Sequence, residues 1–242
     1  DHGSLYEQKI ASAGVLSGLK RTSGRTGRAI TFITPDSQRT FATYLGVAST
    51  LASEDIDHNK IKEAMFLHVE GYQLEDPLLR STAQNAMAFA KQNGVKISLD
   101  LADKNIVLRN LEFIHTLAKR YVDILLANED EAKAFCGEHP YEKCLQIMSC
   151  YSDIAIVKLG ENGSMIKRGE SFFRIRPVQA KAVDSTGAGD LYAAGVLFGL
   201  SKRLKIEKAG MIGSYMGAKV VESVGVRLHG IKQAEIQKII NQ

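Results

Sequence analysis

The chain has 242 residues, 45% of them hydrophobic and 24% charged, which is the composition of an ordinary globular protein. This length favours one large α/β domain over several small ones. The net charge of +4 is spread over 31 basic and 27 acidic residues. No basic run is interleaved with aromatic residues, so a nucleic-acid partner is not expected. No apolar run reaches membrane-spanning length and no signal-peptide pattern occurs, so we expect no membrane association and a cytoplasmic location.

The cysteine content predicts neither a disulfide framework nor a zinc site. Cys136, Cys144 and Cys150 are an odd number of cysteines, and their spacings match no zinc-binding pattern. We therefore expect reduced cysteines that pack inside a cytosolic protein.

The first predicted elements are a helix at 4–14 and a β-hairpin. Residues 29–34 and 39–45 are two extended runs, and Pro35-Asp36-Ser37-Gln38 supplies turn chemistry between them. The hairpin lies outside the helix–strand alternation that follows. We therefore expect residues 24–46 to project as a small lid-like sheet over one edge of the main domain.

Short apolar runs and helical patterns alternate along the rest of the chain, which predicts a doubly wound, mostly parallel α/β sheet flanked by helices. The expected strands are 65–69, 96–99, 124–126 and 154–157, and the expected helices between them are 78–93, 105–120 and 128–150. A second hairpin at 164–168 and 171–175 and three helices at 188–202, 205–223 and 232–240 complete the pattern. We interpret residues 1–242 as a single α/β domain.

A glycine-rich turn at 184–190, Asp-Ser-Thr-Gly-Ala-Gly-Asp, carries the strongest chemical signal. It lies between a β-rich stretch at 172–183 and a helix of small residues at 191–200. Such a turn aligns free backbone N–H groups at the positive end of a helix, where they can hold a phosphoryl group. Asp190 beside them could accept the proton of an attacking hydroxyl. On spacing alone, an equal alternative is a helix start whose Asp190 only complements the helix dipole.

The segment Asp184–Leu197, DSTGAGDLYAAGVL, resembles the C-terminal motif of the ribokinase-like, PfkB-type carbohydrate and nucleoside kinases along its whole length. Three other segments follow the order that this family shows. TPDSQRTFATYLG at 34–46 looks like its substrate lid, ANEDE at 127–131 like its Asn-x-x-Glu element, and VKLGENG at 157–163 like its nucleotide-contacting strand and turn. The resemblance covers essentially the whole chain. It implies a ribokinase-like fold and transfer of the γ-phosphoryl group of ATP to a hydroxymethyl group of a sugar or nucleoside.

For the catalytic step, the resemblance implies that Asp190 is the general base and that Gly187-Ala188-Gly189 forms the anion hole for the γ-phosphoryl group. Asn128 and Glu131 match the pair that organises Mg²⁺ and its waters, and Glu131 would act through a water molecule. From the residues alone, Asn128 is an ordinary N-cap and Glu131 its capping-box partner. Both roles can coexist.

Lys158, Gly160 and Gly163 match positions that contact the nucleotide, and Gly225 matches the border of the adenine pocket. Lys158 departs from the pattern, because many relatives have threonine there. A lysine would neutralise phosphate charge directly, and the alternative is a strand-end lysine that reaches solvent. Gly225 could equally be a helix C-cap.

Asp184 and Thr186 match positions that help form a monovalent-cation site in many members of the family, and Asp184 could equally be a turn residue. The expected cofactors are therefore ATP and Mg²⁺, with K⁺ as a further candidate.

The acceptor is less well defined than the phosphate site. The opening part of the family pattern, with its Gly-Gly-rich stretch, has no counterpart before the hairpin, so we expect a longer biological protein. Glu70-Gly71-Tyr72 and Asp100 follow predicted strands, where ligands bind in open α/β sheets. His68 lies inside an apolar run and is expected to be a core residue. The hairpin and Glu70-Gly71-Tyr72 look most like the adenosine-kinase-like branch.

Two other functions stay open. A non-catalytic nucleotide or metabolite sensor on the same fold would bind ATP without phosphorylating an acceptor, although a pure binder has no use for Asp190. A phosphosugar kinase would need a basic cluster near the acceptor, for which Arg25 and Arg28 are the only candidates.

We also expect a homodimer through the hairpin. Lids of this kind often pair between protomers in the family, and the alternation of the hairpin leaves Phe32, Phe41 and Tyr44 as apolar surface.

Overall fold

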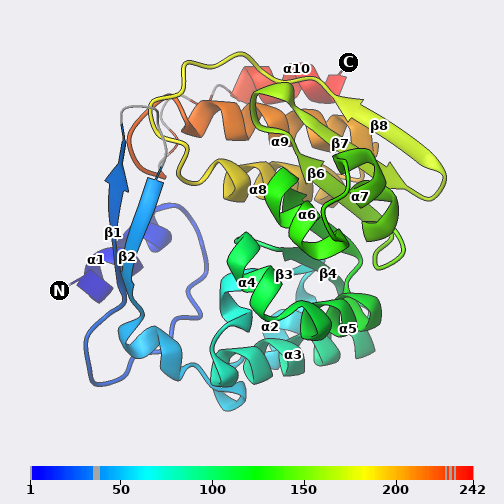
Figure 1. Cartoon of the computed structure of the whole chain (residues 1–242). Coiled ribbons are helices and arrows are strands. Elements are labelled where there is room, and N and C mark those ends of the chain that lie inside the picture. Colours follow the sequence, from blue (N-terminus) through cyan, green and yellow to red (C-terminus); the bar gives the residue numbers. More distant parts are fainter. Residues whose placement is uncertain (1, 35–38, 227, 229–230, 232, 242) are drawn as a thin grey trace.

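The described strands form two separate sheets (Figure 1). The computed structural model describes residues 2–34, 39–226, 228, 231 and 233–241. The larger sheet has six strands, whose order in space is their order in the chain: β3 (Phe66–Glu70), β4 (Lys96–Asp100), β5 (Ile124–Asn128), β6 (Ile154–Lys158), β7 (Ser164–Arg168) and β8 (Ser171–Ile175). β3 to β6 are parallel, and β7 and β8 continue the sheet antiparallel. The predicted α/β fold with a mostly parallel sheet is confirmed.

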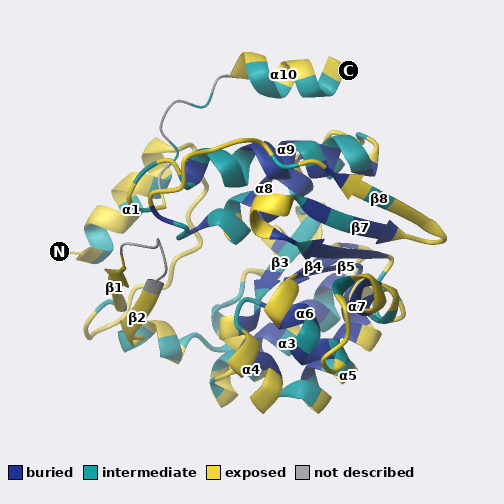
Figure 2. Cartoon of the chain, turned by 45° about the horizontal axis from the view of Figure 1, so that its top comes forward, coloured by how far each residue is buried: buried dark blue, intermediate teal, exposed yellow. Residues whose placement is uncertain are grey.

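Helices cover both faces of this sheet, and Figure 2 shows its central strands, β4 to β6, buried between them. One core, around side chains such as Leu99 and Phe135, packs beneath α2 (His58–Glu63), α3 (Pro77–Gln92), α4 (Lys104–Arg109), α5 (Leu111–Tyr121), α6 (Glu129–Cys136) and α7 (Tyr141–Met148). The other core, around Ile156 and Val196, packs beneath α8 (Ala188–Ser201) and α9 (Ile206–Val220). α10 (Gln233–Asn241) lies on α9, where Lys208 Nζ donates to the Ile240 carbonyl at 2.7 Å.

Aspartate N-caps begin three helices of the first layer. Asp57, Asp76 and Asp103 each accept hydrogen bonds from two backbone N–H groups in the first turn of α2, α3 and α4. Pro77 follows Asp76 at the first helical position, where its missing N–H group costs nothing. These caps fix where each helix starts after its loop.

Two helices predicted as continuous are broken, so those predictions are wrong. The helix expected at 105–120 breaks at Asn110, whose side-chain amide donates to Glu75 Oε2 at 2.9 Å and to the Ile106 carbonyl at 3.0 Å. The helix expected at 128–150 ends at Gly137, which has a left-handed φ of 79°, and resumes after Pro140. The β-rich stretch expected at 172–183 is a strand only as far as Ile175.

The hairpin forms the second sheet and stands apart from the six-stranded one (Figure 1). β1 (Arg28–Ile33) and β2 (Arg39–Tyr44) pair antiparallel, which confirms both predicted strands, whereas the predicted turn at 35–38 lies outside the described residues. Phe32 is 58% exposed and Tyr44 is 56% exposed. The boundaries of the lid, its closure over a substrate and a dimer through it stay predictions. α1 (His2–Ser12), close to the predicted helix at 4–14, lies beside the hairpin.

Glycines let α8 and α9 approach each other closely. A Cβ atom on Gly195 would lie 2.7 Å from Gly213 Cα, and one on Gly199 would lie 2.6 Å from Ala209 Cα. Both distances are shorter than any van der Waals contact between carbon atoms. Because α8 begins next to Asp190, this packing fixes the position of that carboxylate relative to the sheet.

Gly195→Ala should therefore destabilise the fold, although alanine is the better helix former. The added methyl group must push α9 away, and such overpacking costs about 1–3 kcal/mol, measured by urea unfolding. Ala194→Ser, at the exposed neighbouring position, is the control and should change the free energy of unfolding by less than about 0.5 kcal/mol. Equal stability of Gly195→Ala and the parent would show that the two helices do not make this contact.

No helix within the described ranges is both long and apolar enough to span a membrane. The three cysteines form no disulfide with one another, and Cys144 is buried, but the prediction that all three pack inside is wrong for Cys150, which is exposed.

Candidate active site

The glycine-rich turn forms the start of α8. Gly187 has a left-handed φ of 79° just before the first helical residue, Ala188. A Cβ atom on Gly187 would lie 3.1 Å from Val226 Cγ1, so the turn passes closely beneath the loop at 224–226. Asp190 lies exposed in the first helical turn. Since the first N–H groups of a helix have no acceptor within it, the turn can present them to an anion beside this carboxylate.

A buried carboxylate fastens the turn to that loop. Asp184 is 1% exposed, and its Oδ1 accepts hydrogen bonds from Thr186 N at 2.9 Å and Thr186 Oγ1 at 2.6 Å. Its Oδ2 accepts from Gly225 N at 2.8 Å. Asp184 is therefore the turn residue that the sequence offered as one interpretation. Gly225 is not a helix C-cap, because α9 is capped by Val221.

Polar side chains at the carboxyl ends of the strands turn toward the start of α8. His68 and Glu70 lie on the face of β3 that shares the core beneath α8, and the register places Glu70 beside Asp100 of β4. The charges of Asp100, Lys158 and Asp190 act on both His68 and Glu70. Side chains from three strands thus converge with Asp190 at one end of the sheet, which is where ligands bind in open α/β sheets.

Lys158 points into the site, so the interpretation as a strand-end lysine in solvent is wrong. Its Nζ lies 2.6 Å from Asp100 Oδ2, and the two side chains are only 14% and 8% exposed. A Cβ atom on Gly189 would lie 3.1 Å from Lys158 Nζ, so the ammonium group lies against the backbone of the turn. Burial alone would lower the pKa of Lys158, but the carboxylates of Asp100 and Glu131 outweigh it and the pKa is raised. The site therefore contains a fixed positive charge.

Asn128 and Glu131 form the predicted capping box at the start of α6. Glu131 N donates to Asn128 Oδ1 at 2.9 Å, while Asn128 N and Nδ2 donate to the two carboxylate oxygens of Glu131 at 2.7 and 2.6 Å. Glu131 is 3% exposed, and burial raises the pKa of its carboxyl group to about 7, against the opposing attraction of Lys158. The N-cap interpretation is confirmed.

The donor set at this edge fits a magnesium ion that is held through water. Within the described ranges, no group of three His, Cys, Asp or Glu side chains could hold a metal ion directly. Mg²⁺ usually keeps several waters and binds through one or two carboxylates together with substrate phosphates. Glu131 with Asn128 offers oxygen acceptors for such waters, so these residues fit the ion that the resemblance implies.

Relative to the parent, Glu131→Gln should be more favourable for stability at pH 8 than at pH 5. The folded state keeps the Glu131 proton up to about pH 7, whereas the unfolded state loses it near 4.5. The unfolded state thus binds fewer protons in that window, and stability falls as pH rises through it, by on the order of 3 kcal/mol. Glutamine carries no charge and keeps one acceptor oxygen for the Asn128 backbone N–H, and the loss of the bond from Asn128 Nδ2 is the same at both pH values. Urea unfolding at both pH values measures the difference.

Glu129→Gln is the matched control, because Glu129 is exposed and pairs with Lys133 at 3.3 Å on the same helix. It should cost a few tenths of a kcal/mol at pH 8, about the value of an exposed helical ion pair. A stability difference for Glu131→Gln that is the same at pH 5 and pH 8 would contradict the raised pKa.

The turn at 160–163 lies against the segment that follows β8. A Cβ atom on Gly163 would lie 2.1 Å from the Ile175 carbonyl oxygen, and its φ is 85°, so only glycine fits. Gly160 has a φ of 55° and open space at its Cβ position. The close packing of the turn therefore explains by itself why residue 163 is glycine. Contact of Gly160 or Gly163 with a nucleotide stays a prediction.

Sequence reasoning placed Glu70 and Asp100 at strand ends where ligands bind, but it set His68 aside as a core residue. His68 has Nδ1 at 3.1 Å from Ser98 Oγ, and burial lowers the pKa of its ring. It is half-buried rather than a core residue. The signal that could have found His68 is alternation, because positions 68 and 70 share one face of the strand at its carboxyl end.

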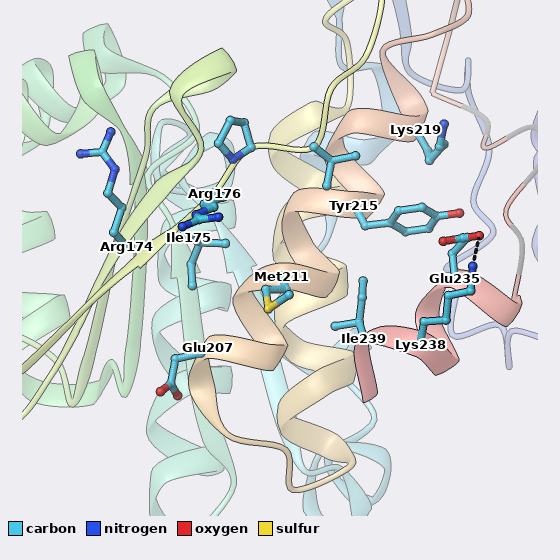
Figure 3. Close-up of a pocket in the computed structure, with 12 residues that line it drawn as sticks. Arg174, Ile175, Arg176, Glu207, Met211, Tyr215, Lys219, Glu235, Lys238 and Ile239 are labelled. Carbon is cyan, nitrogen blue, oxygen red and sulfur yellow. Dashed lines mark hydrogen bonds and ion pairs between the residues drawn. The ribbon is translucent and has the colours of Figure 1, made fainter. Parts of the chain in front are cut away.

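A cavity of about 820 Å³ lies elsewhere, between β8, α9 and α10 (Figure 3). Tyr215 extends from α9 toward α10, where Glu235 and Lys238 pair at 3.1 Å. No residue that the sequence predicted for the active site lines this cavity.

Comparison with known proteins identifies the family. Residues 1–233 match the pfkB family carbohydrate kinase pattern. An uncharacterized sugar kinase of Archaeoglobus fulgidus is 29% identical over 216 residues, which are 86% of this chain and 81% of that protein. The structure of a probable sugar kinase from Rhizobium etli superimposes with a TM-score of 0.94 at 28% identity, over 99% of this chain and 74% of that one. The structure of adenosine kinase from Sinorhizobium meliloti superimposes with a TM-score of 0.90 at 29% identity, over 94% of this chain and 71% of that one.

Proposed function

We propose, because this chain belongs to the pfkB family of carbohydrate kinases, that it transfers the γ-phosphoryl group of ATP to a hydroxymethyl group of a sugar or nucleoside. One observation carries the proposal. At the start of α8, the exposed carboxylate of Asp190 adjoins the backbone of Gly187-Ala188-Gly189, against which the ammonium group of Lys158 lies. Phosphoryl transfer needs a carboxylate that accepts the proton of the attacking hydroxyl. It also needs N–H groups and a positive charge that bind the transferring phosphoryl group.

In the proposed reaction, Asp190 accepts the proton of the acceptor's hydroxyl group. The oxygen of that hydroxyl group attacks the γ-phosphorus at the same time. A new O–P bond forms, the bond from the γ-phosphorus to the bridging oxygen breaks, and ADP leaves with that electron pair. The N–H groups of the turn and Lys158 stabilise negative charge on the transferring group. Mg²⁺ neutralises phosphate charge when bound, and Asn128 and Glu131 are the residues that would hold its water shell.

The nucleotide would lie between the turn at 160–163 and the loop that carries Gly225. Gly160 and Gly225 have open space at their Cβ positions, which leaves room for a ligand. Asp184 accepts hydrogen bonds from both Thr186 N and Gly225 N. A movement of the loop that carries Gly225 would therefore displace the anion hole as well. We also propose that a monovalent cation such as K⁺ binds beside Asp184 and Thr186.

The acceptor that we favour is an adenosine-like nucleoside or a ribose-type sugar. The similarity to the Sinorhizobium meliloti adenosine kinase supports the nucleoside, and the similarity to the sugar kinases supports the sugar.

Release of ADP in a coupled assay tests the proposal, with MgATP and a panel of adenosine, ribose and fructose. The expected result is ADP release that depends on an acceptor and on Mg²⁺. Calorimetric binding of ATP without acceptor-dependent ADP release would contradict a kinase and favour the nucleotide sensor.

A further inference from the structure

We infer that the cavity between β8, α9 and α10 is a second binding site, for a small aromatic compound that carries one acidic group. None of the described residues assigned to the phosphoryl-transfer site lines this cavity. The inference therefore goes beyond the proposed function and does not depend on it.

The cavity has the size and the apolar surface that an aromatic ring system needs. Its volume of about 820 Å³ lies within the range of about 300–1,000 Å³ that is typical of small-molecule sites. Met211 and Tyr215 of α9 line it between Ile175 of β8 and Ile239 of α10 (Figure 3). A methionine side chain adapts its shape and its sulfur packs well against rings, and a tyrosine ring packs against other rings. These side chains can therefore hold a flat apolar body.

The charged side chains that line the cavity favour an anionic ligand. Lys238 pairs with Glu235 at 3.1 Å, and Lys219 pairs with Glu222, which lies outside the lining, at 2.9 Å. Positive charges outnumber negative ones by two among the described lining residues, which are Arg174, Arg176, Lys219 and Lys238 against Glu207 and Glu235. A ligand with one negative charge would thus complement the site.

Arg176 is the cation best placed to bind the acidic group. Figure 3 shows Arg174 extending away from α9, whereas the carbonyl of Arg176 accepts a hydrogen bond from Ser214 Oγ of α9 at 3.1 Å. Within the described residues, the guanidinium group of Arg176 makes no hydrogen bond or ion pair. Glu207 lies in the first turn of α9, about 12 Å along the helix axis from Tyr215. An acidic group beside Arg176 would therefore gain a charge-assisted hydrogen bond at the end of the cavity away from Glu207.

Binding of 1-anilinonaphthalene-8-sulfonate to the folded full chain tests the inference. This probe joins a flat apolar body to one sulfonate group, and it fluoresces strongly when it leaves water. We expect one saturable site per chain, with a dissociation constant on the order of 10–100 µM, which is ordinary for a ligand of this size. Excess MgATP should leave the bound probe in place, because the phosphoryl-transfer site lies elsewhere.

A second probe and two substitutions separate the acidic group from the apolar body. N-phenyl-1-naphthylamine has the same ring system without the sulfonate. Arg176→Gln should weaken the sulfonate by about fivefold and leave the uncharged probe within about twofold, because it removes the charge of a partly solvated side chain. Met211→Trp should weaken both probes by at least about 10-fold, because the larger side chain occupies the space that they need.

Arg168→Gln is the matched control. It removes the same charge from an exposed position on β7, outside the described lining of the cavity. It should change the affinity of neither probe.

The lack of a saturable site on the folded chain would overturn the inference. Displacement of the probe by MgATP would overturn it too, because the probe would then lie in the nucleotide site. Unchanged affinity of the sulfonate for Arg176→Gln would do the same, and this variant alters only an exposed side chain, so it decides the matter even if Met211→Trp does not fold. Absence of acceptor-dependent ADP release, by contrast, would overturn the proposed function and leave this site standing.

Discussion

Asp190→Asn is expected to lower kcat for acceptor phosphorylation by about 10³-fold and to leave the KM for ATP within about threefold of the parent value. The amide has nearly the same size and keeps the start of α8, but it cannot accept the proton of the attacking hydroxyl. The loss therefore falls on the chemical step rather than on nucleotide binding. Steady-state kinetics at saturating MgATP and varied acceptor measure it.

Asp153→Asn provides the control for that experiment. Asp153 is 74% exposed and pairs with Lys96, the first residue of β4, so it lies at the amino ends of the strands. Its substitution removes one negative charge and should leave kcat unchanged. Equal turnover by Asp190→Asn and the parent would remove Asp190 as the base and would return this segment to a simple helix start.

Lys158→Met is expected to have the second large effect, on stability and activity together. The substitution removes the cation that pairs with Asp100, whose nearly buried side chain lies beside Glu131. Because an unpaired buried charge is unfavourable, the loss should cost about 2–4 kcal/mol of unfolding free energy. It also removes the positive charge from beneath the anion hole. Phosphoryl transfer should fall by about 100-fold or more.

The double variant Asp100→Asn/Lys158→Met separates the two effects. Neutral side chains at both positions leave no unpaired buried charge, so urea unfolding should recover most of the lost stability. Activity should stay low, because the charge beside Gly189 is still absent. Recovery of activity together with stability would show that Lys158 serves the fold and not the phosphoryl group.

The sequence predicted the parts of the site that are local. The Asp184–Asp190 turn, the capping box of Asn128 with Glu131 and the alternation of strands and helices all depend on residues a few positions apart, whose geometry follows from backbone preferences. These features were found correctly. The breaks at Asn110 and Gly137 were local as well, but the apolar periodicity continues across them and concealed them.

The pairing of Asp100 with Lys158 at the strand ends could not be predicted in the same way. Asp100 and Lys158 are 58 residues apart in the chain. They meet because β4 and β6 both pair with β5, which brings their carboxyl ends together, and because both side chains face α8. That arrangement depends on which strands pair and on how deeply α8 packs, which the glycines of α8 and α9 decide together. Such long-range pairing is a property of the folded chain and leaves only the alternation of residue types in the sequence.

The most direct test of the proposed function is ³¹P NMR of the reaction product formed with MgATP and the acceptor that the panel identifies. The proposed function predicts a phosphate monoester signal coupled to methylene protons, which grows in step with ADP. Formation of inorganic phosphate alone, or no consumption of ATP with any acceptor, would contradict it.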